Sequence, residues 1–375
     1  MRILVLIHEY PPIGGGGGRV AQDVARGLAA RGHAVCVLAP HMRGLSFDSL
    51  DDGVRVMRVP SLRRQAFVGD ILAMSGYLVA GFFAALHLVR QFRPDVIHVH
   101  FAVPAGVLAW VLSRLTGIPY VLTTHLGDVP GGVPEKTDRW FRWIYPFTPR
   151  IWQDAADVIA ISDFTQHLAQ VHYPVPMRVI PNGVQSSVQP ADIHVQTPPH
   201  IIFAGRFVPQ KDPLLIPDIL YSLRDLLWHC TLIGDGPLCD SVMQKTRRLG
   251  LQDRVTFTGW GSQNAVMEHL LAGDILLLPS RAEGIPMVGL QALAAGLAIV
   301  ASPVGGVPEL VQVGRNGFLH PPGDPEPFAH SLRTLISDAE SLRRARLASL
   351  EISQRFDLTC VVTAYENALH EAAHR

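Results

Sequence analysis

The sequence predicts an α/β protein with two Rossmann-like, doubly wound parallel-sheet domains that face each other across an interdomain cleft. Two observations support this prediction. Short β-branched runs alternate with longer helical segments, and most runs are apolar throughout, as in strands buried on both faces. A polar stretch with three prolines, residues 182–200, divides the alternation into two series. Ligands of such sheets bind beyond the carboxyl ends of the strands, so two facing sheets would form a cleft.

The boundaries of the expected domains come from the two series of strand-like runs. The first series comprises residues 2–7, 34–39, 54–59, 95–100, 119–124, 157–162 and 178–181. The second comprises residues 200–205, 230–235, 254–259, 274–279 and 297–302. We expect an N-terminal domain over 1–183, a linker over 184–199 and a C-terminal domain over 200–355. The segment 356–375 has helical periodicity and is expected to bridge back to the N-terminal domain.

Composition narrows the classes of function. The 375 residues include 32 basic and 32 acidic side chains, a balance that argues against nucleic acid as the main partner. The four cysteines form no C-x-x-C pair, and no Asp-x-Asp pair occurs, so neither a zinc site nor a metal site of the Asp-x-Asp type is indicated. The first apolar run lacks the longer apolar region and cleavage site of a secretory signal. We expect a cytoplasmic protein that needs no cofactor.

One apolar segment raises the question of a membrane. Residues 71–89 contain no Asp, Glu, Lys or Arg and are long enough to cross a bilayer. Arg63 and Arg64 precede the segment, and Arg90 and Arg93 follow it. We favour a helix packed on the sheet, then a helix at the inner face of the membrane, and last a true span.

Five consecutive glycines, Gly14 to Gly18, follow the first strand-like run. They do not form a Walker A loop, because Arg19 and Val20 stand where Lys and Ser or Thr would follow. A dinucleotide fingerprint starting at Gly14 would need glycine at position 19. The run is therefore predicted to be the loop between the first strand and the first helix, where a phosphate could approach the backbone. A merely flexible turn is the alternative.

Two pieces of the C-terminal half carry candidate chemistry. Arg206 and Lys211 stand between a strand and a helix, where two cations could converge on a diphosphate, although surface basic residues are common. Glu283 follows a strand end and precedes a helix expected to start near Met287, with Pro286 at its first turn. A phosphate could bind the free amides of that helix while Glu283 accepts hydrogen bonds from sugar hydroxyls. Glu283 could instead be a helix-entry charge.

These pieces, in this order, resemble the family 4 glycosyltransferases, which are retaining enzymes of the GT-B fold that use nucleotide-sugar donors. The resemblance covers nearly the whole chain. It rests on PPIGG (11–15), DVIHVHF (95–101), TTH (123–125), IPNGV (180–184), GRFVPQKD (205–212), LIGDGP (232–237), RVTFTG (254–259) and the block 280–311.

The resemblance implies roles for individual residues. His125, Arg206, Lys211 and Glu283 would be catalytic. The donor would be bound by Gly14, Gly15, Gly16, Gly205, Gly284, Ile285, Pro286, Met287, Val288 and Gln291. Gln291 departs from the family, which has a second glutamate there that accepts hydrogen bonds from both ribose hydroxyls, whereas an amide offers one acceptor oxygen. Gly17 and Gly18 exceed the family pattern, and we expect from them only added mobility.

The resemblance also implies transfer with retention by a front-face route, in which the departing phosphate takes the acceptor proton. The N-terminal domain would bind the acceptor and the C-terminal domain the nucleotide sugar. Glu9, His100 and Asp128 are acceptor-side candidates, and His100 could instead be a packing residue. The loop 125–147 would influence the choice among glycan, lipid-linked and small-molecule acceptors. Its residues Trp140, Trp143 and Tyr145 could stack on a sugar or pack under the cleft. UDP-, GDP- and ADP-sugars remain open as donors. The alternatives are a sugar-nucleotide epimerase or a phosphorylase of the same fold, or a non-catalytic subunit.

Overall fold

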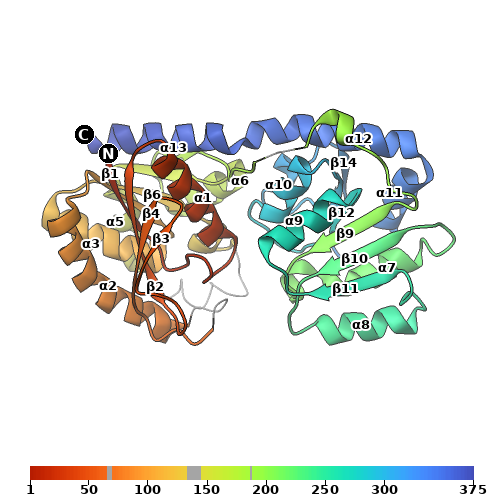
Figure 1. Ribbon diagram of the computed structural model, residues 1–375, viewed down its shortest axis with the longest axis horizontal. Coiled ribbons are helices and arrows are strands. Elements are labelled where there is room, and N and C mark those ends of the chain that lie inside the picture. Colours follow the sequence, from red (N-terminus) through yellow and green to blue (C-terminus); the bar gives the residue numbers. More distant parts are fainter. Residues whose placement is uncertain (66–69, 133–144, 186–187) are drawn as a thin grey trace. The chain divides into compact units, whose positions relative to one another are not determined.

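The computed structural model describes residues 1–65, 70–132, 145–185 and 188–375. The chain divides into two compact units (Figure 1). Unit 1 comprises Met1–Gly183 and Leu358–Arg375, and unit 2 comprises Val184–Asp357. Each unit is built around one largely parallel sheet with helices, so the predicted α/β fold with two Rossmann-like domains is confirmed.

The sheet of unit 1 has the strand order β3-β4-β2-β1-β5-β6-β7-β8. Its strands are β1 (Arg2–Leu6), β2 (Ala34–His41), β3 (Asp48–Asp51), β4 (Val54–Pro60), β5 (Val96–His100), β6 (Tyr120–Thr124), β7 (Asp157–Ala160) and β8 (Arg178–Val179). All neighbours are parallel except β3, which pairs antiparallel with β4 at the edge. Sequence analysis missed β3 because its residues, Asp-Ser-Leu-Asp, carry no apolar run.

Helices cover both faces of this sheet. One apolar core contains residues of α2 (Ile71–Phe92), α3 (Val107–Thr116), α5 (Pro149–Gln153) and α6 (Asp163–His172). Ile97 and Val99 of β5 point into that core, so His98 between them points to the other face. There His98 meets Tyr365 of α13 (Leu358–Ala373), which packs beside α1 (Gly16–Ala30).

The last helix of the chain therefore belongs to the first unit. Arg31 donates to a Glu366 carboxylate oxygen at 2.6 Å, and His33 Nε2 lies 2.7 Å from the other oxygen. A Cβ atom on Gly27 of α1 would lie only 2.4 Å from Val362 of α13. The segment predicted to be a linker, in contrast, is joined to unit 2, since Val184 donates its N–H to Phe356 O at 2.8 Å.

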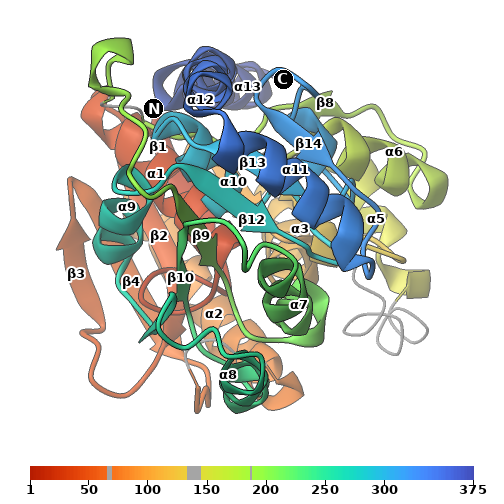
Figure 2. The same ribbon diagram turned by 90° about the vertical axis from the view of Figure 1, so that its right-hand side faces the viewer.

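The sheet of unit 2 has the order β11-β10-β9-β12-β13-β14 and is parallel throughout (Figure 2). Its strands are β9 (His200–Ala204), β10 (His229–Ile233), β11 (Val255–Gly259), β12 (Ile275–Leu278), β13 (Ala298–Ala301) and β14 (Gly317–Leu319). One core includes residues of α7 (Ile216–Tyr221), α8 (Cys239–Arg248) and α11 (Pro325–Ser337), and the other includes α9 (Gln263–Leu271) and α10 (Met287–Ala294). α12 (Ala339–Ser353) contributes to both.

The strand orders locate the ligand-binding edge of each sheet. β1 lies between β2 and β5, and β9 lies between β10 and β12, so the direction of winding reverses at these strands. In doubly wound sheets, ligands bind beyond the carboxyl ends of the strands at such a reversal. Predicted site residues follow β1, β5 and β6 in unit 1, and β9 and β12 in unit 2, at these edges.

Candidate functional site

The glycine run lies at the carboxyl end of β1 and is divided between a turn and a helix. Gly14 has a φ of +94°, a left-handed conformation that suits glycine. Gly15 is the N-cap of α1, and the first turn of α1 starts at Gly16. The predicted loop is therefore too long, because three of its five glycines are helical.

Gly17 and Gly18 are glycines because other groups approach them closely. A Cβ atom on Gly17 would lie 2.5 Å from Phe101 Cζ and 3.3 Å from His125 Cε1. A Cβ atom on Gly18 would lie 2.6 Å from the Glu9 carbonyl oxygen. The expectation that these two residues add only mobility is wrong, since their missing side chains let α1 pack against the ends of β1, β5 and β6.

Phe101 is a residue of this edge that sequence analysis did not single out. Its φ of 73° lies in the left-handed region, which costs energy in a residue other than glycine. The Phe101 ring stacks on the His125 ring, with centroids 4.3 Å apart, and presents an edge to His8 at 4.7 Å. No local sequence pattern signals a left-handed phenylalanine, because tertiary contacts hold it there.

His125 lies in a buried group of histidines. His100 Nδ1 is 3.3 Å from His125 Nε2, and the His98 and His100 rings lie 4.3 Å apart. Burial lowers the pKa of His125 to about 3 and that of His98 to about 3, and it holds the pKa of His100 well below its usual value. At neutral pH these rings are uncharged, and both ring nitrogens of His125 have partners, since its side chain also accepts the backbone N–H of Asp128.

Asp128 links the ends of two strands through hydrogen bonds to their backbone. Its Oδ1 accepts the N–H of Ala102, just after β5, at 2.9 Å, and its Oδ2 accepts the N–H of His125, just after β6, at 2.8 Å. Burial raises the pKa of the carboxyl group to about 7, although these backbone hydrogen bonds oppose the shift. Asp128 was predicted to contact the acceptor, and in this structure both of its oxygens bind backbone amides.

Glu9 lies beside the start of α1. Its Oε2 accepts the N–H of Gly15 at 3.2 Å, and its Oε1 is 3.9 Å from Arg63 Nη2. The side chain of Arg63 is only 2% exposed and donates to the His8 carbonyl oxygen at 3.1 Å. Arg63 is therefore a buried residue of unit 1, although it precedes the apolar segment in the chain.

The centre of the candidate site in unit 2 is a buried ion pair. Lys211 Nζ lies 2.5 Å from Oε1 and 2.7 Å from Oε2 of Glu283, and Ser280 Oγ donates to Oε1 at 2.6 Å. The Lys211 and Glu283 side chains are 14% and 5% exposed. The structure thus joins two predicted catalytic residues that follow β9 and β12.

The two loops that carry this pair are bound to each other along their length. Arg281 donates its N–H to Gln210 O at 2.8 Å, and Gln210 Nε2 donates to Ala282 O at 2.9 Å. Arg281 Nε also donates to Asp212 Oδ2 at 2.8 Å. These contacts hold the two loops together, so Lys211 and Glu283 are kept next to each other.

Gly305 and Gly306 pack closely against the backbone of the Glu283 loop. Sequence analysis did not single them out. A Cβ atom on Gly305 would lie 1.6 Å from the Glu283 carbonyl oxygen. Gly306 donates its N–H to Gly284 O at 2.9 Å. The GG pair in the sequence was a usable signal, because paired glycines after a strand often mark a close approach of backbone.

The remaining donor candidates of unit 2 follow β9 or β12, as this pair does. Arg206 is partly exposed, and within the described part of the chain its guanidinium group makes no ion pair. The helix α10 starts at Met287, as predicted, with Pro286 as an N-cap that offers no side-chain hydrogen bond. Gln291 is half-buried on α10, whereas Ile285 is buried in the core. Cationic groups and uncapped amides thus lie around one strand edge, as anion binding requires.

Other predicted features take less part in this arrangement. Gly205 lies 3.8 Å, measured from a Cβ atom built on it, from the Lys211 side chain. Tyr145 donates its hydroxyl to His172 O at 3.1 Å. Trp140 and Trp143 fall outside the described residues. Among the described residues, no cluster of three or more His, Cys, Asp or Glu is placed to hold a metal ion.

Comparisons with known proteins cover most of the chain. Residues 15–183 match the family described as "Glycosyl transferase 4-like domain", and residues 198–338 match "Glycosyl transferases group 1". Glycogen synthase from Mycobacterium tuberculosis is 28% identical over 97% of this chain and 93% of that protein.

Solved structures share the fold of the whole chain. Sucrose-phosphate synthase from Thermosynechococcus elongatus superposes with a TM-score of 0.82 at 19% identity, and the match covers 98% of both chains. Alr3699/HepE from Anabaena, solved in complex with UDP, has a TM-score of 0.76 at 23% identity, over 99% of this chain and 100% of that one.

The close approach at Gly17 predicts an effect of adding one methyl group. Gly17→Ala should lower the free energy of unfolding by about 1–3 kcal/mol, because the new Cβ displaces the Phe101 ring. Gly15→Ala is the matched control, since nothing lies within 4 Å of its Cβ position, and it should stay within about 0.5 kcal/mol of wild type. Urea unfolding followed by fluorescence measures both. Equal stability of the two variants would contradict the packing role of Gly17.

The buried carboxyl group of Asp128 predicts a pH dependence of stability. Its folded pKa of about 7 lies above the unfolded value, so the native state holds the proton longer and stability falls as pH rises from about 4 to 7. Between pH 5 and 8, wild type should lose about 2 kcal/mol more than Asp128→Asn. Urea titrations at the two pH values test this, with the exposed Asp163→Asn as control. A wild-type slope in Asp128→Asn would exclude Asp128 as its source.

Proposed function

Because the chain belongs to the family 4 glycosyltransferases of the GT-B fold, we propose that this enzyme transfers a hexose-type sugar from a nucleotide-sugar donor to an acceptor, with retention of configuration. The observation that carries the proposal is the buried Lys211–Glu283 pair at the carboxyl edge of the unit 2 sheet. Two further groups for an anionic ligand lie at the same edge, namely Arg206 and the uncapped start of α10.

The donor diphosphate is proposed to bind Arg206, Lys211 and the first amides of α10. An ammonium group has three N–H donors, so Lys211 can hold Glu283 and still donate to a phosphate oxygen. Charge develops on the phosphate as the sugar leaves, and fixed cations stabilise that charge more in the transition state than in the bound donor. Glu283 is proposed to accept hydrogen bonds from hydroxyls of the sugar. The neighbour solved with UDP supports a nucleotide at this type of site.

The unit 1 residues are proposed to serve the sugar and the acceptor. His125, kept neutral by burial and held by its contacts with His100 and Asp128, is proposed to lie beside the transferred sugar. The amides at the start of α1 and the Gly14–Gly16 turn are proposed to contact the donor phosphates, as the family resemblance implies. Asp128 acts through His125 as a positioning residue, because it binds the His125 backbone.

The reaction is proposed to proceed on one face of the sugar. The bond between the anomeric carbon and the phosphate oxygen breaks, and its electron pair stays on the departing nucleoside diphosphate. The acceptor oxygen forms the new bond from the same side, and its proton passes to that phosphate oxygen. The protein supplies position and positive charge in this route, and no protein carboxylate is bonded to the sugar.

The acceptor class is proposed to be a glycan, a lipid-linked sugar or a small molecule. The glycogen synthase relative favours a glycan. An epimerase would consume donor without an acceptor, and a phosphorylase would release sugar phosphate in the presence of inorganic phosphate. A non-catalytic subunit would bind the nucleotide but would not turn over any nucleotide-sugar donor. A panel of UDP-, GDP- and ADP-sugars, screened for binding and for slow hydrolysis, separates these functions.

Removing the buried cation should reduce catalysis. With the donor found in that panel, Lys211→Ala should lower turnover about 10²- to 10³-fold, because the departing diphosphate loses a fixed charge. The control is Lys245→Ala, which removes a lysine of unit 2 that pairs with Asp218 on the surface. Circular dichroism and thermal unfolding show whether the variant is folded. Wild-type turnover in Lys211→Ala would refute the assigned role.

The glutamine of α10 gives a second test. Gln291→Glu restores two acceptor oxygens for the ribose hydroxyls, so nucleotide affinity should stay the same or rise by up to about tenfold. Calorimetry with the preferred nucleotide measures the affinity, and Gln244→Glu, an exposed change on α8, is the control. A large loss of affinity in Gln291→Glu alone would show that this position does not contact the ribose.

A further inference from the structure

His100 is a fully buried histidine at the end of β5. It is 0% exposed, and its Nδ1 lies 3.3 Å from Nε2 of His125. His98 stands two residues earlier, on the same face of the strand, with its ring 4.3 Å from that of His100. Thr123, which is opposite His100 in the register of β5 and β6, lies 2.9 Å from His98 Nε2. His100 is thus enclosed by buried side chains, one of which is the predicted catalytic residue His125.

The backbone of Asp128 determines which nitrogen of His125 carries the proton. The His125 side chain accepts the Asp128 N–H, which is shared with the His125 carbonyl oxygen at 2.9 Å. Because Nε2 faces His100, the accepting nitrogen is Nδ1. A ring nitrogen that accepts a hydrogen bond carries no proton, and a neutral imidazole has a single N–H. His125 is therefore protonated at Nε2.

The proton of His100 follows from that of His125. The Nε2–H of His125 can be accepted only by an unprotonated Nδ1 of His100, so His100 is protonated at Nε2. This second N–H is buried and has no hydrogen-bond partner among the described residues. Buried donors without a partner are rare. A histidine at this position is therefore best explained by the bond that its other nitrogen makes.

The remaining contacts leave the His125 ring little room. Phe101 stacks on one face with centroids 4.3 Å apart, and a Cβ position on Gly17 lies 3.3 Å from His125 Cε1. The hydrogen bonds to His100 and Asp128 hold the two nitrogens of the ring. Without an acceptor at His100, the Nε2–H of His125 would be a buried donor with no partner, and the ring would gain by turning away.

We propose that His100 is a positioning residue for glycosyl transfer, which accepts the Nε2–H of His125 and keeps that ring in one tautomer and one orientation. This inference deepens the function proposed above and rests on it, because His125 is proposed to lie beside the transferred sugar. The role requires an acceptor atom in the place of Nδ1. Asparagine offers one in its side-chain oxygen, whereas leucine has nearly the same shape and no acceptor.

The matched pair His100→Asn and His100→Leu tests this role through kinetics. Turnover is measured as hydrolysis of the UDP-, GDP- or ADP-sugar that the panel identifies. His100→Leu should lower kcat about 10- to 100-fold with the donor KM within about threefold of wild type, because ring orientation is lost and donor binding is kept. His100→Asn should stay within about fivefold of wild type in kcat, because it keeps the acceptor. A merely structural role would change both variants alike.

Nitrogen NMR of protein with ¹⁵N-labelled histidine tests the hydrogen bond without any substrate. The chain has 17 histidines, and the signals of His100 and His125 are assigned by their loss in His100→Asn and His125→Asn. Long-range correlations distinguish a proton on Nε2 from a proton on Nδ1. Both rings should be neutral and protonated at Nε2 at neutral pH. The His125 Nε2 signal should shift in His100→Leu, because its acceptor is gone.

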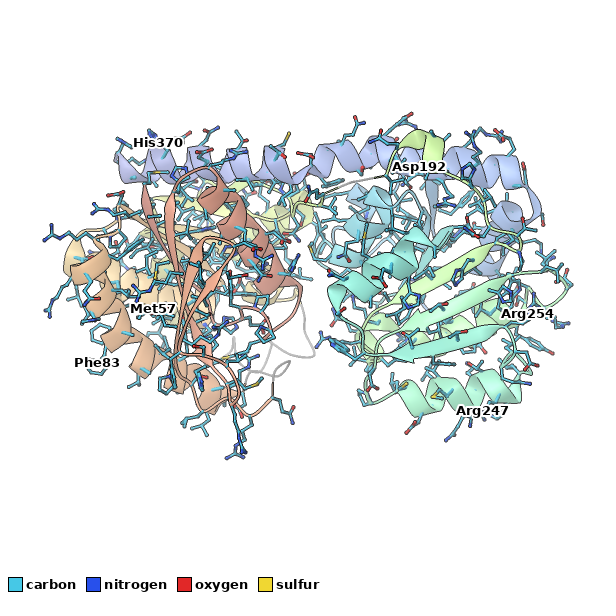
Figure 3. All side chains as sticks on the ribbon, viewed as in Figure 1. Met57, Phe83, Asp192, Arg247, Arg254 and His370 are labelled. Atoms are coloured by element: carbon cyan, nitrogen blue, oxygen red, sulfur yellow. The ribbon has the colours of Figure 1, made fainter. Side chains whose placement is uncertain are left out.

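An exposed histidine of the same unit serves as the control. His370→Leu changes the exposed side chain labelled on α13 in Figure 3 and should leave turnover and the His125 signal as in wild type. Circular dichroism and thermal unfolding show whether each variant is folded. If His100→Leu does not fold, the wild-type spectrum and the rate of His100→Asn still decide.

Three outcomes would overturn the proposal. They are a His125 ring protonated at Nδ1 in wild type, wild-type turnover in His100→Leu, and a loss of turnover in His100→Asn as large as in His100→Leu. Absence of turnover in wild type with every donor of the panel would contradict the proposed function instead. In that case the spectra would still decide whether His100 accepts the hydrogen bond of His125.

Discussion

The candidate site of unit 2 depends on one interaction, the buried ion pair between Lys211 and Glu283. Two charges taken out of water cost several kcal/mol unless they meet in good geometry, and removing one partner from such a pair costs about 3–5 kcal/mol. Ser280 and the backbone contacts between the two loops provide that geometry. Arg206 follows β9 and α10 follows β12, so both lie at the strand edge that carries this pair.

Unit 1 organises its site residues by close packing and backbone hydrogen bonds instead of by an ion pair. Gly17 leaves room for the Phe101 ring, Phe101 stacks on His125, and Asp128 ties the backbone of His125 to the end of β5. These close contacts restrict the conformations of the side chains that make them. Together these contacts hold the neutral His125 ring in one orientation.

The burial of individual residues in and near α2 could not be predicted from the composition of this segment. Both faces of the helix carry apolar residues, so the sequence pattern alone could not say which face packs on the sheet. Arg63 and Arg64 are neighbours in the chain, but the first is buried against His8 and the second is exposed. A charge count over this region therefore overestimates its surface charge, because one of the two arginines is buried.

The sequence by itself determined the two α/β series, the start of α10, the loops that carry Arg206, Lys211 and Glu283, and the glycosyltransferase family, because these follow from local periodicity and short motifs. Only the tertiary structure showed why Gly17 and Gly18 are glycines and that Phe101 has a left-handed backbone conformation. It also showed that Asp128 accepts the backbone N–H of His125 and that Gly305 packs against the Glu283 backbone. Lys211 and Glu283 stand 72 residues apart. A contact between residues so far apart in the chain forms only when their strands pair. A local sequence pattern therefore cannot predict it.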